Sequence, residues 1–101
     1  MQFMLIGRDG TDEGALDRRL AVREAHIALG DKLVAEGRML FGTALLGDDG
    51  NMIGSMLVLD YPSRAELDQW LAVEPYATSG VWEEITITPV RVGPSFVGLH
   101  K

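Results

Sequence analysis

The 101-residue chain contains no cysteine, and this absence removes disulfide bonds, thiolate metal ligands and thiol nucleophiles from its possible chemistry. Basic residues are also few, with 9 Lys and Arg against 15 Asp and Glu, so the chain lacks the clustered positive charge that nucleic acids require. No apolar run approaches the ~18 residues of a membrane-spanning helix, and the N-terminus has no basic segment typical of a signal peptide. We therefore expect a cytoplasmic protein that binds neither nucleic acid nor membrane.

The composition is that of a folded globular protein, with 47% hydrophobic and 24% charged residues, and the length fits one domain over residues 1–101. Short apolar runs bounded by turn residues predict strands, and helical spacing with capping residues predicts helices. The predicted elements are a strand over residues 2–8, a helix over 13–36, strands over 38–46 and 53–60, a helix opened by Ser63, a strand over 81–92 and a tail over 93–101.

This βαββαβ order predicts an α+β, ferredoxin-like fold, in which a four-stranded antiparallel sheet carries two helices on one face. The two middle strands are apolar on both faces, and the side chains expected to point outward are Leu40, Leu46, Met52, Met56 and Val58. An antiparallel sheet open to water should alternate apolar and polar residues, so a second copy is the expected cover and we predict a homodimer. The alternative is that the tail folds back over this face.

The predicted helix over residues 13–36 carries polar residues inside its apolar side. On a wheel of ~100° per residue, the arc expected to face the sheet runs from Leu29 to Leu20 and includes Val22, Ile27, Leu33 and Val34. Within that arc is a stripe of Arg19, Arg23, His26 and Gly30. Buried charges need a cleft or paired carboxylates, which makes the stripe a candidate site. Alternatively, the arginines extend to the helix edge and His26 is a hydrogen-bonded core residue.

Candidate carboxylate partners for this stripe lie in the second half of the chain. Glu74 precedes Pro75, which restricts its backbone, while Glu83 and Glu84 point to opposite faces of the last strand. The other histidine, His100, lies in the tail without metal-ligand spacing. No Gly-rich phosphate loop or nucleophile elbow is present. We therefore expect neither a metal nor a cofactor.

Four segments together resemble the YCII-related family. They are RLAVREAHIAL in the first helix, EGRMLFGTALL entering the second strand, Gly54 in the third strand and EPYATSGVWEEITITPVRV at the end. The resemblance covers nearly the whole chain and implies a dimeric α/β-barrel architecture. It also implies a histidine/aspartate-centred active site, matched here by His26 and by Glu74, where the family typically has aspartate. Family members with a known reaction include a dehydrochlorinase of a chlorinated hydroxyquinol.

The resulting functional hypothesis is a cofactor-free enzyme that performs acid/base chemistry, of isomerase, lyase or hydrolase type, on a small anionic or phenolic molecule. Its pocket is expected between the first helix and the sheet, with His26 as general acid/base and Glu74 orienting it. The substrate-binding candidates are Arg19, Arg23, Tyr76 and Trp82. The alternative function is a dimeric module that binds a small molecule without catalysis.

Overall fold

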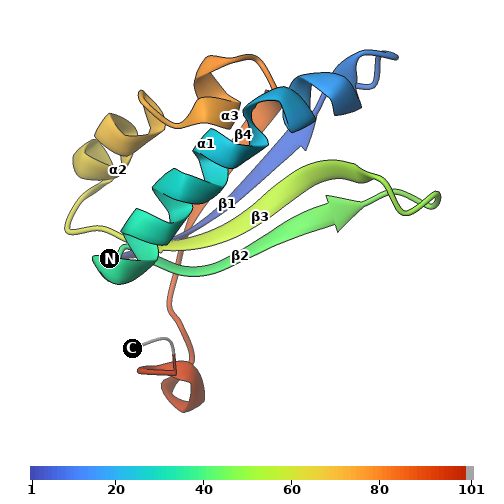
Figure 1. The fold of residues 1–101 in the computed structure, drawn as a ribbon. Helices are drawn as coiled ribbons and strands as arrows, with labels where there is room; N and C mark the ends of the chain where they lie inside the picture. The colour runs from blue at the N-terminus through green and yellow to red at the C-terminus, as the bar shows by residue number, and fades with distance from the viewer. Residues whose placement is uncertain (100–101) are drawn as a thin grey trace.

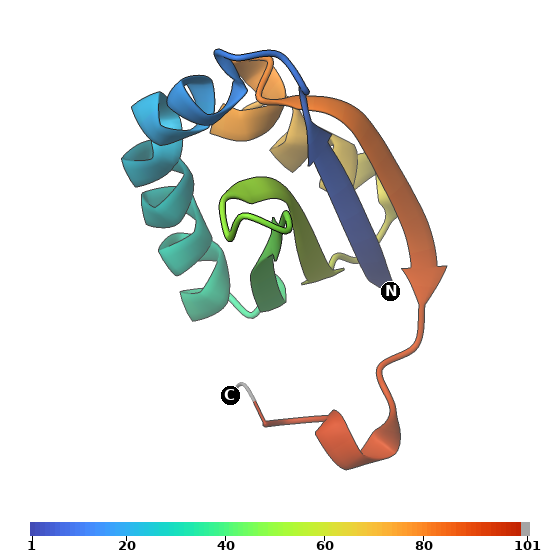
Figure 2. The same ribbon diagram turned by 90° about the vertical axis from the view of Figure 1, so that its right-hand side faces the viewer.

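An antiparallel four-stranded sheet in the order β2-β3-β1-β4 organises the chain, whose computed structural model describes residues 1–99. The elements are β1 (Gln2–Asp9), α1 (Ala15–Ala35), β2 (Met39–Leu46), β3 (Met52–Asp60), α2 (Arg64–Leu71), α3 (Pro75–Thr78), β4 (Trp82–Val90) and the 3-10 helix η1 (Pro94–Phe96). Helices α1, α2 and α3 lie on one face of the sheet (Figures 1 and 2). The predicted ferredoxin-like fold is confirmed, although neither α3 nor η1 is predicted from the sequence.

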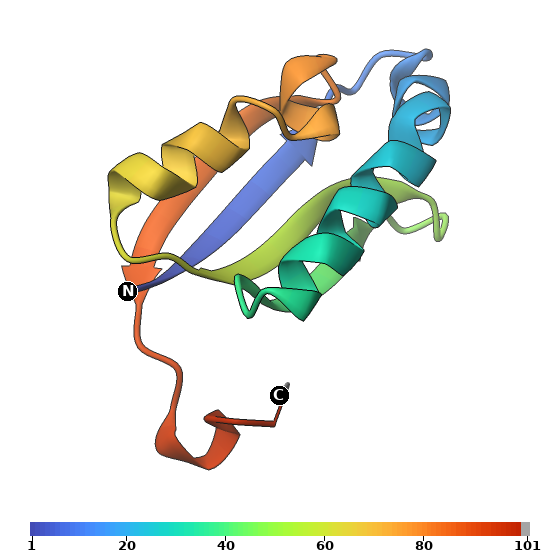
Figure 3. The same ribbon diagram turned by 60° about the vertical axis from the view of Figure 1, so that its left-hand side comes forward.

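The three helices divide the covered face between them. Figure 3 shows α1 above β2 and β3, whereas α2 and α3 lie above β1 and β4. None of the helices within residues 1–99 combines the length and the apolar character needed to cross a membrane. Residues of α1, β2 and β3 line the cavity that forms the candidate site.

Local sequence explains where the helices begin and end. The Ser63 hydroxyl accepts a hydrogen bond from the Glu66 N–H at 3.2 Å and so caps the N-terminus of α2, as predicted. Gly37 has a φ of 75° just beyond α1, and the Arg38 N–H then donates to the Leu33 carbonyl at 2.8 Å. Glycine adopts this left-handed conformation without the steric cost of a Cβ atom, so the chain can turn into β2.

The hydrophobic core fills the space between the sheet and the helices. Its buried members are Phe3, Leu5, Leu33, Met39, Leu57, Leu59, Tyr61, Leu67, Trp70, Tyr76, Val81 and Trp82. Residues alternate in β1 so that every second side chain is buried under the helices, which is the pattern of a sheet covered on one face.

The predicted apolar arc of α1 is wrong along one edge. Leu20, Ile27 and Val34 are 49%, 40% and 51% exposed, whereas Arg19 is only 3% exposed. The helix is therefore rotated so that part of the polar stripe faces inward. The physical reason is that Arg19 finds acceptors inside the fold, which compensate the cost of burying its charge.

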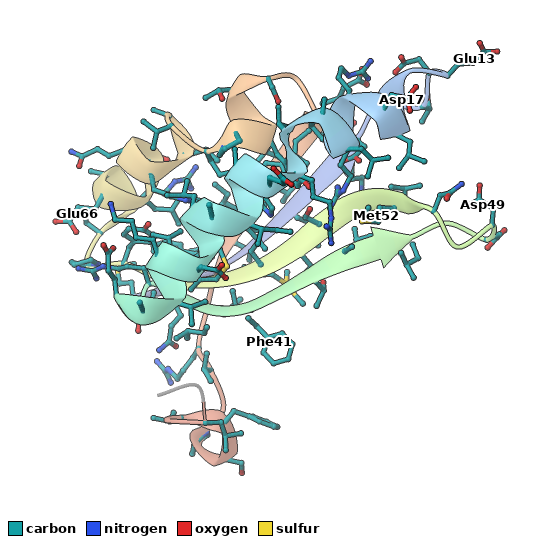
Figure 4. The ribbon with its side chains drawn as sticks, in the orientation of Figure 1. Glu13, Asp17, Phe41, Asp49, Met52 and Glu66 are labelled. Atoms are coloured by element: carbon teal, nitrogen blue, oxygen red, sulfur yellow. The ribbon has the colours of Figure 1, made fainter. Side chains whose placement is uncertain are left out.

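A register shift in β2 changes which of its residues face the helices. The shift lies between Met39 and Phe41, and beyond it Phe41 is paired with Val58 and Gly42 with Leu57. Figure 4 shows Phe41 projecting from β2 on the side away from α1. Met39 belongs to the core under the helices, and Leu40 borders a hollow with Phe41 and Val58, so the outward position predicted for Leu40 agrees with the structure. The bulge at Leu40 interrupts the strict alternation that the prediction assumes, and Phe41 therefore lies on the open side together with Leu40.

The open face of the sheet keeps part of its predicted composition. Met56 and Val58 alternate with the buried Leu57 and Leu59 and so point away from the helices, as expected. Met52 instead lines the cavity under α1. In the tail, the described side chains of Phe96, Val97 and Leu99 are 58%, 63% and 66% exposed and leave the sheet beyond β4 (Figure 2). Phe96 nevertheless lines a hollow with Leu40, Phe41 and Val58, so within residues 1–99 the tail borders part of this face without covering it.

Candidate functional site

A cavity of about 370 Å³ lies between α1, the strands β2 and β3, and the start of α3. Its lining residues are Arg19, Arg23, His26, Ile27, Gly30, Asp31, Val34, Met39, Gly42, Thr43, Ala44, Met52, Ser55, Leu57 and Tyr76. Met52 is labelled in Figure 4 on the strand side of this cavity. Arg19, Arg23, His26 and Gly30 from the polar stripe of α1 therefore border one concavity. Because Gly30 and Gly42 have no side chains, both walls stay open at this point.

His26 and Glu74 form a hydrogen-bonded pair at the end of this cavity. His26 Nδ1 is bonded to Glu74 Oε1, and the two side chains are 17% and 1% exposed. Since an ionised carboxylate can only accept, the hydrogen of the neutral ring belongs on Nδ1. The second nitrogen, Nε2, then carries the free lone pair.

The local sequence fixes the carboxylate of Glu74 in place. Glu74 is the N-cap of α3, and its Oε2 accepts a hydrogen bond from the Ala77 N–H at 3.0 Å. Pro75 occupies the first turn of α3, where its missing N–H costs nothing, and it restricts Glu74 to an extended backbone conformation. Both carboxylate oxygens are therefore engaged, one by the backbone and one by the histidine.

Aromatic side chains hold the imidazole ring from two directions. Tyr76 stacks on His26 with ring centroids 3.8 Å apart and an interplanar angle of 13°, and Trp82 meets His26 edge-on at 6.1 Å. Tyr76 lines the cavity, as the sequence predicts, but Trp82 is not among the lining residues and is only 4% exposed. Trp82 thus packs against His26 from the core and does not itself border the cavity.

Burial raises the pKa of the Tyr76 phenol above its ordinary value of 10.0, although the nearby Arg19 charge acts in the opposite direction. The phenol therefore remains neutral at physiological pH. It contributes a flat apolar surface beside the histidine rather than a second charge.

Arg19 is held in a buried network that the sequence does not predict. Its Nη1 donates to both carboxylate oxygens of Asp9 at 3.1 Å, its Nη2 donates to Ser55 Oγ at 2.9 Å, and its guanidinium lies 4.6 Å from the centroid of the Tyr76 ring. Asp9 resembles a strand-ending turn residue in the sequence, and its only distinguishing signal is its place after a buried strand. The sequence predicts that Arg19 anchors a substrate. In the structure its terminal nitrogens are instead engaged by Asp9 and Ser55.

Arg23 contrasts with Arg19, although both lie on α1 and line the cavity. The Arg23 side chain is exposed, and within residues 1–99 it forms no ion pair. Asp31 supplies a carboxylate to the same lining. Arg23 is therefore a cation whose charge is available at the cavity rim.

The other candidate carboxylates of the sequence analysis do not join this arrangement. Glu83 and Glu84 are exposed on β4, and Glu74 alone of the three candidates bonds to His26. In the part of the chain that the structure describes, no three His, Asp or Glu side chains are grouped to hold a metal ion. His100 lies outside the described residues.

Known proteins are similar to this chain in sequence and in fold. The chain is 29% identical to protein YciI of Escherichia coli O6:H1 over 97 residues, which cover 90% of this chain and 97% of YciI. An uncharacterized protein of Haemophilus influenzae is 33% identical over the same shares. Among solved structures, 5-chloro-2-hydroxyhydroquinone dehydrochlorinase (TftG) from Burkholderia phenoliruptrix AC1100, in complex with 2,5-dihydroxybenzoquinone, matches with a TM-score of 0.80 and 25% identity, covering 94% of this chain and 98% of TftG.

The sequence profile of the YCII-related domain matches residues 1–91, which is nearly the whole of the chain and includes every residue of the site described above. The chain therefore belongs to the YCII-related family.

Proposed function

We propose that the chain is a cofactor-free enzyme that performs acid/base chemistry on a small anionic or phenolic molecule, with His26 as the group that takes and gives the proton. The observation that carries this proposal is the one-sided engagement of the ring: Nδ1 is bonded to the buried Glu74, while His26 lines an open cavity. A general base needs a nitrogen that can reach the ligand. The cavity of about 370 Å³ falls within the ~300–1,000 Å³ range of small-molecule sites.

The likeness to TftG supports this class of substrate. That protein is a dehydrochlorinase of a hydroxylated hydroquinone and was solved with 2,5-dihydroxybenzoquinone. Both molecules are small rings that carry several oxygen atoms. A reaction of isomerase, lyase or hydrolase type on such a ring moves a proton at one step, and we assign this step to His26 because it lines the cavity.

The residues divide the chemical work between them. Neutral His26 accepts a proton at Nε2, and the carboxylate of Glu74 stabilises the positive ring that results. Arg23 binds an anionic substituent of the substrate from the cavity rim, because its charge has no partner within residues 1–99. Arg19 is not assigned this role, since Asp9 and Ser55 already occupy its terminal nitrogens.

We also propose that two copies pair through the sheet face that carries no helix. Met4, Ile6, Met56 and Val58 point to this face and remain partly exposed in the single chain. Sedimentation equilibrium should give a dimer with twice the 11.0 kDa mass of the chain. A species of 11.0 kDa at micromolar concentration would contradict the pairing.

The experiment that tests the proposed function begins with a thermal-shift screen of aromatic acids, lactones and quinols. A compound present at 100 times its dissociation constant should add about 2.7 kcal/mol to the free energy of unfolding. Compounds that bind are then tested for turnover by the unaltered chain and by His26→Ala. Turnover that depends on His26 supports the enzyme, whereas binding without turnover would make the chain a small-molecule-binding module.

A further inference from the structure

The Ser55 hydroxyl lies in the cavity wall with both of its lone pairs occupied. Its Oγ accepts one hydrogen bond from Arg19 Nη2 at 2.9 Å and another from Trp82 Nε1 at 3.3 Å. A guanidinium and an indole N–H only donate, so neither can receive the hydrogen of the hydroxyl itself. Within residues 1–99 that hydrogen has no acceptor. The Ser55 O–H is therefore an unpaired donor on a residue that is 1% exposed.

A second donor without a partner lies beside Ser55. Arg19 Nε is buried and, in the described part of the chain, makes no hydrogen bond. Ser55 and Arg19 line the same cavity as His26, and Trp82 bonds to Ser55 while its ring packs against the edge of His26. Buried donors that lack an acceptor cost free energy, so a ligand that supplies an acceptor here is favoured.

We infer that the Ser55 hydroxyl donates a hydrogen bond to an oxygen atom of the substrate, and that the site therefore selects ligands with a carbonyl or oxyanion oxygen at this point. The inference rests on the proposed function, because it assigns a second contact to the same ligand. Arg19 strengthens the donor: a hydroxyl that accepts from a cationic guanidinium is polarised and donates more strongly through its own hydrogen.

The position of this donor fits the proton transfer assigned to His26. When Nε2 takes a proton from a hydroxyl or an acidic C–H group of the ligand, the bonding electron pair stays on the ligand as a phenolate or enolate oxygen. The ring becomes an imidazolium whose Nδ1–H still bonds to Glu74. The Ser55 O–H then donates to the negative oxygen, and the proton later returns from Nε2 to the ligand or its product.

The test compares two serine variants in binding 2,5-dihydroxybenzoquinone, measured by titration calorimetry. Ser55→Ala should weaken binding at least tenfold, the loss expected for one hydrogen bond to a charged oxygen. Ser63→Ala is the matched control, since it removes the hydroxyl that caps α2, far from the cavity lining, and it should bind within threefold of the unaltered chain. Equal affinities for Ser55→Ala and the unaltered chain would overturn the inference.

A crystal of the unaltered chain soaked with the same quinone provides a second measurement. It does not depend on whether Ser55→Ala folds. A quinone oxygen about 3 Å from Ser55 Oγ supports the inference, and an oxygen bound elsewhere in the cavity contradicts it. If the unaltered chain binds no quinone at all, the inference is also wrong. The proposed function is tested separately by His26-dependent turnover, so normal turnover with an unaffected Ser55→Ala variant would remove only the Ser55 contact.

Discussion

Two pairs, each made of a carboxylate and a nitrogen base, contact the ring of Tyr76, and they differ in how far their side chains are exposed. Asp9 and Arg19 are buried together, with side chains 2% and 4% exposed, and Arg19 lies over the Tyr76 ring. Glu74 is equally buried, but His26, which stacks on the same ring, is 17% exposed and lines the cavity. Both members of the first pair are buried, whereas the second pair includes a histidine that is partly exposed and lines the cavity.

Under the proposed function, this difference separates a pair that stabilises the fold from a pair that performs the proton transfer. In the buried ion pair, Asp9 and Ser55 occupy the terminal nitrogens of Arg19, so the pair resists disruption and its charge is compensated inside the fold. A histidine that is fixed through one nitrogen keeps the other available for proton transfer. Replacing a member of the Asp9–Arg19 pair should therefore lower the stability of the fold. Replacing a member of the His26–Glu74 pair should lower turnover.

The largest effect is expected on turnover when His26 is replaced. General acid/base catalysis contributes roughly 10²- to 10⁴-fold, so kcat on a substrate found in the screen should fall by that factor in His26→Ala. Glu74→Gln keeps the size of the side chain but loses the charge, and its kcat should fall by less. Steady-state kinetics measures both, and wild-type turnover by His26→Ala would eliminate the catalytic role.

The inward pair should instead dominate stability. Asp9→Asn leaves the Arg19 charge buried without compensation, so the free energy of unfolding should fall by about 3–5 kcal/mol. Urea denaturation measures this loss. Adding Arg19→Met to Asp9→Asn should restore part of the stability, because it removes the uncompensated charge. A loss below 1 kcal/mol in Asp9→Asn would show that the pair does not stabilise the fold.

The two cavity arginines should separate in the same way. Arg23→Ala should raise KM for an anionic substrate about tenfold with little change in kcat, as expected for a residue that only binds. Lys32→Ala is the matched control, because Lys32 is an exposed cation on α1 outside the cavity lining. The assignment of Arg23 fails if both variants change KM equally.

The smallest effect is expected at the surface pair of Asp12 and Arg18. The hydrogen bond from Arg18 holds the pKa of Asp12 at about 2, below the ordinary 3.8. A lowered carboxyl pKa stabilises the fold above about pH 3.8, and the contribution disappears as the pH falls toward 2. Asp12→Asn should therefore be slightly less stable than the unaltered chain at pH 5, and urea denaturation should show this difference shrinking as the pH falls through about 2. A loss as large as that of Asp9→Asn would contradict the distinction between exposed and buried pairs.

Much of the fold could be predicted because it depends on local patterns. The strand alternation, the Ser63 cap and the stop at Gly37 are each visible in a few neighbouring residues. The four-residue helix α3 is too short to show periodicity, and the bulge at Leu40 depends on pairing with a distant strand. Such features require tertiary context.

The site was predictable to a similar extent. A polar stripe on an apolar helix face singles out His26, and the family resemblance singles out Glu74. The sequence cannot separate Arg19 from Arg23, since they lie one turn apart on the same stripe and only the fold brings Asp9 and Ser55 to one of them. Local sequence does not reveal the roles of Asp9 and Ser55, because these roles arise from contacts with Arg19 at separations of 10 and 36 residues.

The most direct test of the central claim is the tautomer of His26, measured by ¹⁵N NMR at a pH where the ring is neutral. The hydrogen bond to Glu74 should place the hydrogen on Nδ1 and leave Nε2 as an unprotonated nitrogen. Glu74→Gln should weaken this preference. If the hydrogen of the unaltered chain resides on Nε2, the nitrogen assigned as the base carries no free lone pair, and the acid/base role of His26 is contradicted.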